Sequence, residues 1–322
     1  MEYDINPLMV RLNLTEFSID RMGAADFNEV GELIYTSTNH WYKEHTGSGV
    51  FSCEPDDALI FCREYEALDP GCCLLLRVNT TRSIAASCFY HPRPTHISLG
   101  ILNVHPDYFG QGAARKLLNA VIALGKQQNL PVRLVSSLLN LDSFSLYNRA
   151  GFVPRAVYQD MLLPADATRL QSGLNSFGEL RDAHLRDCEA ITQLEFEQCG
   201  IDRRKDFEHI LTNSSGVWHT SLVNDTQGRL KGFLASCAHP AHCMLGPGFM
   251  LDDDAAEALI CRELLHRLPL QPLLLVPSSR STLLHRLYTR GARNVELHAW
   301  QCLGEWYEPM GIVMPTFLPE SL

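Results

Sequence analysis

Apolar runs alternate with amphipathic stretches along the first half of the chain. Short apolar or alternating runs predict strands near residues 17–21, 72–78, 83–91, 96–104, 132–137 and 155–163. Stretches with a helical period predict helices near 26–40, 56–67, 110–128 and 142–150. The helix predicted from Gly110 is the most regular, because its apolar residues form one stripe: Ala114, Leu117, Leu118, Val121 and Ile122. Strands that alternate with helices indicate an α/β or α+β fold.

The same order of landmarks occurs twice. Ala-Ser-Cys followed by His-Pro stands at 86–92 and again at 235–240. An apolar run that ends in two serines, and then a helical segment with Tyr before Gly, follow at 132–151 and at 273–291. This order predicts a duplicated domain. Residues 164–178 are rich in Pro, Ala, Ser and Gly and are predicted to be the linker between domains 1–163 and 179–322.

The composition restricts the class of function. Hydrophobic residues make up 46% and charged residues 20% of the 322 residues, as in soluble globular proteins. The net charge of −10 argues against a nucleic-acid partner, because such proteins carry clustered Lys and Arg. No apolar run of about 20 residues predicts a membrane span. The acidic N-terminus does not resemble a secretory signal, so the expected location is the cytoplasm.

Cysteine and histidine give little sign of a metal site. The 11 cysteines form no CxxC pair, and we expect reduced, mostly buried thiols. The cluster His239–Cys243 contains metal-ligand residue types, but its spacing fits no standard zinc pattern and is more typical of a loop after a strand. We therefore expect no metal.

The segment 101–116 has the pattern of an anion site. An apolar strand is followed by a turn at 106–107 and by small residues that open a long helix. The first N–H groups of a helix have no internal partner, and the helix dipole adds partial positive charge there. Arg115 would add a positive side chain in the first turn. Small residues leave room for a phosphate at Gly110, Gly112, Ala113 and Ala114. The alternative to an anion site is a glycine-bearing loop that only turns the chain.

A second group of polar residues follows the strand predicted at 132–137. Ser143 and Tyr147 are four residues apart and therefore share one helix face. Gly151 is suited to end that helix. Alternatively, Tyr147 packs on the sheet as a half-buried amphipathic side chain.

Together these segments resemble the GNAT superfamily of N-acyltransferases, over residues 17–163 and most specifically over 96–152. The family carries a Val-x-Pro strand end and a phosphate loop of the form Arg/Gln-x-x-Gly-x-Gly/Ala. Later it has Asn-x-x-Ala/Ser, a Tyr four residues on, and Gly-Phe at the helix end. The matching residues here are Val104, Pro106, Gly112, Ala114, Asn140, Ser143, Tyr147, Gly151 and Phe152. Phe109 departs from the family's Arg or Gln, which we expect to matter little because backbone N–H groups hold the phosphates.

The resemblance implies a fold and a reaction. Each of two GNAT-like domains would have a mixed, mostly antiparallel twisted sheet flanked by helices. Acetyl-coenzyme A would be the co-substrate, and an acetyl group would move to a primary amine by direct attack. Tyr147 would protonate the leaving thiolate as general acid. The residues expected to contact the coenzyme are Leu102, Asn103, Val104, Gly110, Gln111, Gly112, Ala113, Ala114, Arg115, Asn140 and Ser143.

The residue that takes the amine proton is less well defined. In relatives a carboxylate on the fourth strand often does so, but the strand predicted at 96–104 contains no Asp or Glu. His96 is the candidate base, because its unperturbed pKa is about 6.5 and it shares a strand face with Ser98. The alternative is an ordinary half-exposed His at a strand start.

The second half has carboxylates where the first half has its phosphate loop. Asp252, Asp253 and Asp254 suit a helix start, but they would repel a pyrophosphate. Tyr288 persists in a leucine-rich helix. We expect a degenerate, non-catalytic domain that completes the acceptor pocket, with a final strand within 311–319.

Two other functions remain open. One is a non-catalytic acyl-coenzyme A sensor, which would bind without turnover. The other is a structural partner protein that binds no coenzyme. The acceptor is expected to be a small-molecule or peptide amine.

Overall fold

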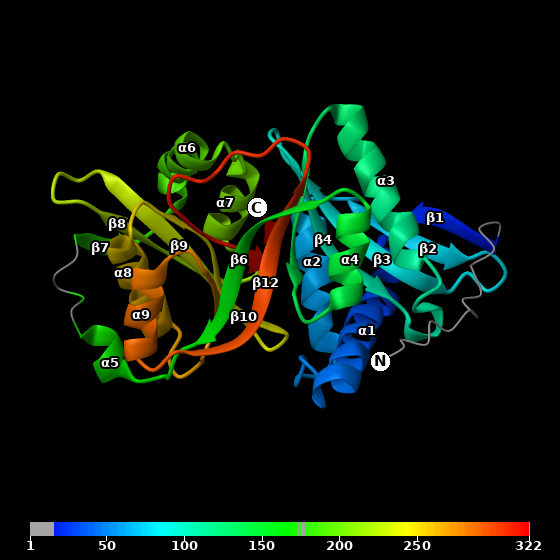
Figure 1. The fold of residues 1–322 in the computed structure, drawn as a ribbon, viewed down its shortest axis with the longest axis horizontal. Helices are drawn as coiled ribbons and strands as arrows, with labels where there is room; N and C mark the ends of the chain where they lie inside the picture. The colour runs from blue at the N-terminus through cyan, green and yellow to red at the C-terminus, as the bar shows by residue number, and fades with distance from the viewer. Residues whose placement is uncertain (1–15, 173, 175–177, 322) are drawn as a thin grey trace, which may run out of the picture. The chain divides into compact units, whose positions relative to one another are not determined.

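The computed structural model describes residues 16–172, 174 and 178–321 (Figure 1). It divides the chain into two compact units. The first unit contains residues up to Tyr90 together with Leu99–Leu124. The second contains His91–Ser98 and the chain from Gly125 onwards.

The first unit is built on strands in the order β1-β2-β3-β4. The pairings of β1 with β2 and of β2 with β3 are antiparallel. The strands are β1 (Phe17–Arg21), β2 (Cys73–Val78), β3 (Ile84–Pro92) and β4 (Ile97–Val104), and the last two extend into the second unit. Each strand end lies within one residue of its predicted position, so these predictions are confirmed.

Helices α1 (Phe27–Thr46) and α2 (Leu59–Leu68) supply much of the core of the first unit. Val30 and Ile34 are one helical turn apart on α1, and both are fully buried. On α2, Tyr65 meets Phe89 of β3 edge to face, with 4.7 Å between ring centroids. Burial of each such side chain contributes about 1.5–3 kcal/mol, which explains why short strands and helices hold together here.

Helix α3 (Ala113–Gln128) begins three residues later than predicted. Gly110 and Gly112 have φ angles of 72° and 94°, in the left-handed region, so they belong to the preceding loop and not to the helix. The predicted apolar stripe is confirmed, because Leu117, Leu118 and Val121 are fully buried.

The second unit contains a mixed, mostly antiparallel sheet, as predicted. Its strand order is β5-β12-β6-β11-β10-β9-β8-β7, and β13 (Ile312–Met314) pairs with β10. The pairings β4–β5 and β10–β11 are parallel. The strands are β5 (Val132–Ser137), β6 (Val153–Leu162), β7 (Glu179–Asp182), β8 (Trp218–Asn224), β9 (Leu230–His239), β10 (His242–Met250), β11 (Leu273–Pro277) and β12 (Arg293–Leu303).

Strands β6 and β12 occupy unexpected positions in this sheet. Although β6 follows β5 in the sequence, it pairs with β11 and β12. Strand β12 pairs with β5 on its other side, where His298 lies opposite Ser137. The final strand of each sequence repeat is therefore exchanged: it pairs with the penultimate strand of the other repeat.

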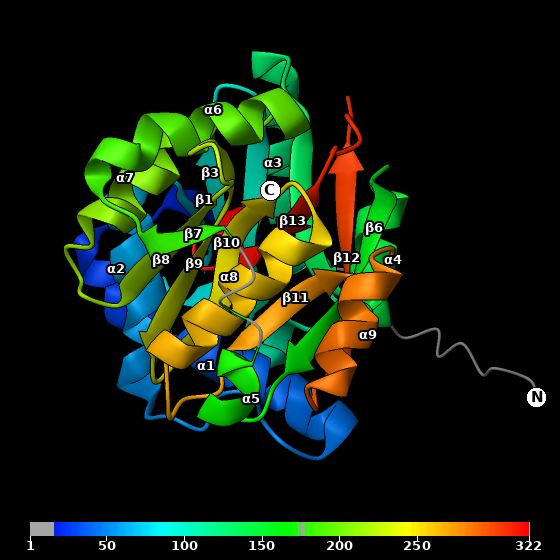
Figure 2. The ribbon, with the colours of Figure 1, turned by 90° about the vertical axis from the view of Figure 1, so that its left-hand side faces the viewer.

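Helices cover both faces of the sheet in the second unit (Figures 1 and 2). Leucines of α8 and α9 pack with β10 and β11 in one core, and α6 and α7 pack with Trp300 and Phe233 in another. The helices are α4 (Leu141–Arg149), α5 (Ala167–Gln171), α6 (Cys188–Cys199), α7 (Arg204–Thr212), α8 (Asp253–His266) and α9 (Ser281–Thr289). The chain ends with β13 and the short pair β14 (Thr316–Phe317) and β15 (Glu320–Ser321), so the predicted final strand is confirmed. Across the described residues, no helix combines the length and the hydropathy required to cross a membrane.

Candidate functional site

The loop between β4 and α3 is held from both ends. The His105 N–H donates to the carbonyl of Ala85 at 2.8 Å, which ties the strand end to β3. Residues 106–108 then form one 3₁₀ turn, capped by the His105 side chain. Gln111 Nε2 donates to the Asp107 carbonyl at 2.6 Å and closes the loop on itself. The loop is therefore a defined structure that leads directly into the helix.

The start of α3 presents backbone donors. The Lys116 N–H donates to the Gly112 carbonyl at 3.1 Å. The N–H groups of Ala113, Ala114 and Arg115 come before this bond, where a helix has no internal acceptors. A Cβ atom at Gly110 would meet nothing within 4 Å, so the backbone is approachable there. This geometry suits an anion with several oxygens.

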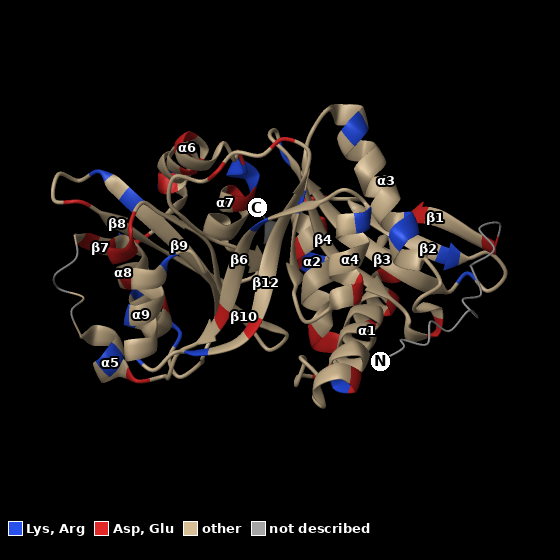
Figure 3. Cartoon of the chain, in the orientation of Figure 1, with Lys and Arg blue, Asp and Glu red and all other residues tan. Residues whose placement is uncertain are grey.

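Basic residues occur at the start of α3 (Figure 3). A guanidinium nitrogen of Arg115 lies 3.4 Å from the position that a Cβ of Gly112 would occupy, so Arg115 folds back beside the loop. Lys116 is already engaged, because its Nζ donates to the Phe17 carbonyl at 2.9 Å. Arg115 is therefore the cation of this pair that is positioned for an incoming phosphate.

The predicted pantetheine-binding residues lie at the end of β4. The Asn103 side chain is buried and donates to the hydroxyls of Ser37 and Thr38 on α1, at 3.3 and 3.2 Å. Its side chain therefore anchors β4 to α1, and the backbone is the part of Asn103 left for a ligand. Leu102 and Val104, on the opposite strand face, are partly exposed.

In the second unit, α4 brings Asn140, Ser143 and Tyr147 together. Asn140 caps the helix, because its side-chain oxygen accepts the Ser143 N–H at 3.0 Å. Tyr147 is 8% exposed. Gly151 has a φ of 98° and ends the helix, as predicted. The Phe152 N–H then donates to the Tyr147 carbonyl at 3.1 Å.

His96 is buried in the second unit. Its side chain has no exposed surface, and Nδ1 lies 3.0 Å from the Thr95 hydroxyl. Burial holds the pKa of His96 well below its usual value, and the neighbouring Arg133, Arg93 and Arg203 lower this pKa further. A sealed imidazole cannot meet a substrate, so these features argue against His96 as the general base.

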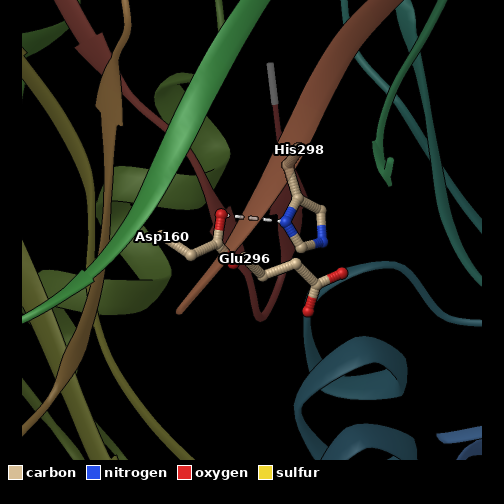
Figure 4. A group of neighbouring side chains, drawn as sticks. All are labelled: Asp160, Glu296 and His298. Carbon is tan, nitrogen blue, oxygen red and sulfur yellow. Dashed lines mark hydrogen bonds and ion pairs between the residues drawn. The ribbon is translucent and has the colours of Figure 1, made fainter. Parts of the chain in front are cut away.

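A group that the sequence did not reveal lies on strands β6 and β12 (Figure 4). One ligand-type atom from each of Asp160, Glu296 and His298 lies within 4.8 Å of the others. His298 Nδ1 and Asp160 Oδ1 are 2.9 Å apart. The group could hold a proton or a cation. It lies elsewhere than the cluster His239–Cys243, whose residues form the turn from β9 to β10.

The counterpart of the phosphate loop in the second unit is closed by its own side chains. Asp252 caps α8 by accepting the Ala255 N–H at 2.9 Å, and it forms an ion pair with Lys231. Asp254 forms an ion pair with Arg286 at 2.6 Å. Carboxylates thus take the place that a phosphate would need.

Tyr288 differs from Tyr147 in its surroundings. It is 44% exposed, and its hydroxyl donates to Gln159 on β6. The Tyr288 hydroxyl therefore links α9 to strand β6.

An open cavity of about 570 Å³ lies within the second unit. Its lining includes Glu197, Glu305, Glu308 and Tyr307, and also Arg133. The acidic residues outnumber Arg133, and this excess of negative charge would repel the phosphates of a coenzyme. This cavity is therefore no candidate for the donor site.

Comparisons with known proteins agree with this geometry. Residues 35–152 match the model of the acetyltransferase (GNAT) family, and residues 191–300 match that of an acetyltransferase (GNAT) domain. Together these matches cover more than half of the chain. The chain belongs to the GNAT family and carries two GNAT domains in tandem. It is an acyltransferase.

Solved structures share the fold at low sequence identity. A protein from Pyrococcus horikoshii assigned to the acetyltransferases has a TM-score of 0.73 and 14% identity, over 94% of this chain and 96% of its own. A GCN5-related N-acetyltransferase from Sphaerobacter thermophilus has a TM-score of 0.60 and 15% identity, over 89% and 95%. A tandem GNAT protein from the clavulanic acid biosynthesis pathway has a TM-score of 0.57 and 14% identity, over 91% and 100%. A sequence comparison with curated proteins gave no match.

Proposed function

We propose that the protein transfers an acetyl group from acetyl-coenzyme A to a primary amine. The observation that carries this proposal is the start of α3, where two glycines in the left-handed region, open N–H groups and Arg115 are combined. The pyrophosphate of the coenzyme would accept hydrogen bonds from the N–H groups of Gln111 through Arg115. The pantetheine would pair with the backbone of Leu102–Val104, as an added strand does.

The reaction needs two proton transfers. The amine nitrogen attacks the thioester carbonyl carbon, the C–S bond breaks, and the thiolate leaves. Tyr147 is the proposed general acid that protonates this sulfur. A base takes the proton that the attacking nitrogen loses. Asn140 and Ser143 belong to the same helix start, and they would contact the coenzyme arm or an ordered water.

The domain 179–322 is proposed to bind no coenzyme of its own. The carboxylates at the start of α8 are engaged with their own helix and with Lys231 and Arg286, which supports this division. One coenzyme per chain is therefore the expected stoichiometry.

A steady-state assay of thiol release across a panel of primary amines tests the proposal, together with calorimetry for acetyl-coenzyme A. Turnover with at least one amine is the expected result. Coenzyme binding without turnover would favour a sensor, and no coenzyme binding would favour a structural protein.

A further inference from the structure

Asp160, Glu296 and His298 stand on two adjacent strands. His298 lies on β12, between β5 and β6, and is directly opposite Ser137 of β5. Glu296, two residues earlier on the same strand face, lies opposite Asp160 of β6. The β12–β6 register shifts between Asn294 and Glu296, and such irregularities often re-aim side chains next to active sites.

The group is directly connected to the start of α4. The Ser137 hydroxyl donates a hydrogen bond to the Glu296 carboxylate. The same hydroxyl oxygen accepts the N–H groups of Leu139 and Asn140, at 3.1 and 3.3 Å. Glu296 is therefore two hydrogen bonds away from the residue that caps the helix carrying Tyr147.

The imidazole of His298 is fixed in one orientation. Nδ1 is engaged with Asp160, whose side chain is almost fully buried, and Phe317 packs on the ring with 5.0 Å between ring centroids. The other nitrogen, Nε2, has no hydrogen-bond partner among the described residues and is not one of the fully buried polar atoms. In Figure 4 it faces away from Asp160, on the side of the Glu296 carboxylate.

A second histidine–carboxylate pair in the same unit, His219 with Glu263, provides a comparison for the partners of the two ring nitrogens. His219 Nδ1 lies 2.9 Å from Glu263, and its Nε2 lies 3.3 Å from Asp182. Both ring nitrogens of His219 are occupied. His298, whose side chain is 8% exposed, differs because Asp160 takes one nitrogen and no described residue takes the other.

We propose that His298 is the general base that accepts the proton of the acceptor amine during acyl transfer. Asp160 holds the proton on Nδ1, so that Nε2 carries the reactive lone pair. Glu296 binds the incoming amine in its ammonium form. This inference rests on the proposed function. It assigns the role of general base to His298 instead of His96.

The proton balance uses the groups already named and solvent water. The ammonium gives one proton to solvent water before attack, and the neutral nitrogen then adds to the thioester carbonyl. His298 Nε2 takes the second proton as the C–N bond forms, and Asp160 stabilises the resulting imidazolium. The C–S bond breaks, and the thiolate takes a proton from Tyr147. The products are the amide and free coenzyme A, and the imidazolium proton returns to the Tyr147 phenolate through solvent.

The test uses the full-length protein and the amine with the highest turnover in the thiol-release assay. His298→Gln should lower kcat about 10²–10⁴-fold and change the acid limb of the pH profile of kcat/KM. Acetyl-coenzyme A should bind as tightly as before. Added imidazole should restore part of the activity of a His298→Ala variant, which would not be expected if His298 only stabilised the fold. Asp160→Asn should lower kcat and keep coenzyme affinity.

The matched control is His219→Gln, which breaks the other histidine–carboxylate pair and should leave the pH profile unchanged. Glu296→Gln should raise KM for the amine more than it lowers kcat, with Glu305→Gln as the control carboxylate. An unchanged pH profile in folded His298→Gln would overturn the inference and leave acyl transfer standing. Activity that depends on an added divalent cation and is lost with a chelator would overturn it in favour of a metal site. A wild-type protein that binds the coenzyme but turns over no amine would overturn both proposals.

Discussion

The ring of Tyr147 packs edge-on against Phe152, with 5.9 Å between the ring centroids and 63° between their planes. Phe152 follows the Gly151 turn, so the end of α4 places the second ring against the first. The aromatic contact fixes the ring of Tyr147 without using its hydroxyl. Removal of the hydroxyl alone should therefore leave the packing unchanged.

Tyr147→Phe is expected to lower kcat about 10–1000-fold, the range for losing a general acid. Coenzyme affinity should change little, because the phenyl ring fills the same space. The free energy of unfolding should fall by about 1 kcal/mol at most, since one hydroxyl hydrogen bond contributes about that much. Steady-state thiol release measures kcat, calorimetry measures the coenzyme affinity, and urea unfolding measures the free energy of unfolding.

Tyr288→Phe is the control for that experiment, because the Tyr288 hydroxyl is bonded to Gln159 and belongs to the second domain. Its turnover should stay close to that of the wild type. Equal losses at the two tyrosines would reject Tyr147 as the specific general acid.

Gly112→Glu is expected to abolish acetyl-coenzyme A binding. The new carboxylate would repel a phosphate, and a φ of 94° is strained for any residue with a Cβ. Calorimetry should report one site per chain in the wild type and none in the variant. The control is Gly228→Glu, in a turn with a φ of 79° and open space around it, which should bind normally. Micromolar affinity retained in folded Gly112→Glu would place the phosphates elsewhere.

Glu195→Gln is expected to lower the free energy of unfolding by about 3–5 kcal/mol, because the buried Arg203 guanidinium loses the charged carboxylate that forms an ion pair with it. Arg203 and Glu195 are both fully buried and joined by two hydrogen bonds, of 2.7 and 2.5 Å. Urea unfolding followed by circular dichroism measures the change. Glu208→Gln is the matched control: it breaks an exposed pair with Arg204, which should contribute about 0–1 kcal/mol. Equal losses in the two variants would contradict the prediction.

The protein should become less stable as the pH falls below about 6.5. Burial lowers the pKa of His242 to about 3, and nearby His239 adds to the shift. Below about 6.5 the unfolded chain binds a proton at this histidine that the folded chain excludes. Stability is therefore lost as the pH falls from about 6.5 towards 3, by up to about 1.4 kcal/mol per pH unit.

Urea unfolding at pH 7 and pH 5 tests this expectation. Between these pH values the wild type should lose about 2 kcal/mol more than His242→Gln, which cannot take up the proton. His285→Gln, an exposed position on α9, should behave as the wild type does. If His242→Gln lost as much stability as the wild type, the histidine would not be the cause.

The local sequence pattern was sufficient to predict most helices and strands. It also drew attention to the loop before α3 and to the start of α4. The period of the apolar stripe predicted α3. It could not show that Gly110 and Gly112 lie before the helix, because a pattern of apolar residues does not reveal backbone φ angles. His96 was expected to be half-exposed because it begins a strand. It is instead buried, as are His91 and Arg93 of the same hairpin, and Arg93 forms an ion pair with Asp206. That contact joins residues 113 positions apart in the sequence.

The residues on β6 and β12 were missed for a similar reason. Asp160 and His298 are 138 positions apart, and neither belongs to a short motif. Each run predicts a strand, but alternation of side chains does not name the partner strand. The repeat suggested two domains of similar strand order, whereas pairing exchanged the final strands. Positions that vary together among related sequences would indicate such a group. A single sequence contains no such information.

The exchanged strands also delay the pairing of β5 while the chain is being synthesised. Strand β5 is complete at residue 137, but its neighbour β12 begins at residue 293, so 156 further residues (293 − 137) must first be made. At about 5–20 residues per second this takes roughly 10–30 s, during which one edge of β5 lacks its native neighbour. Unpaired edges attract other chains. A nascent chain arrested before residue 293 should therefore associate with chaperones, and release of the full-length chain should end that association.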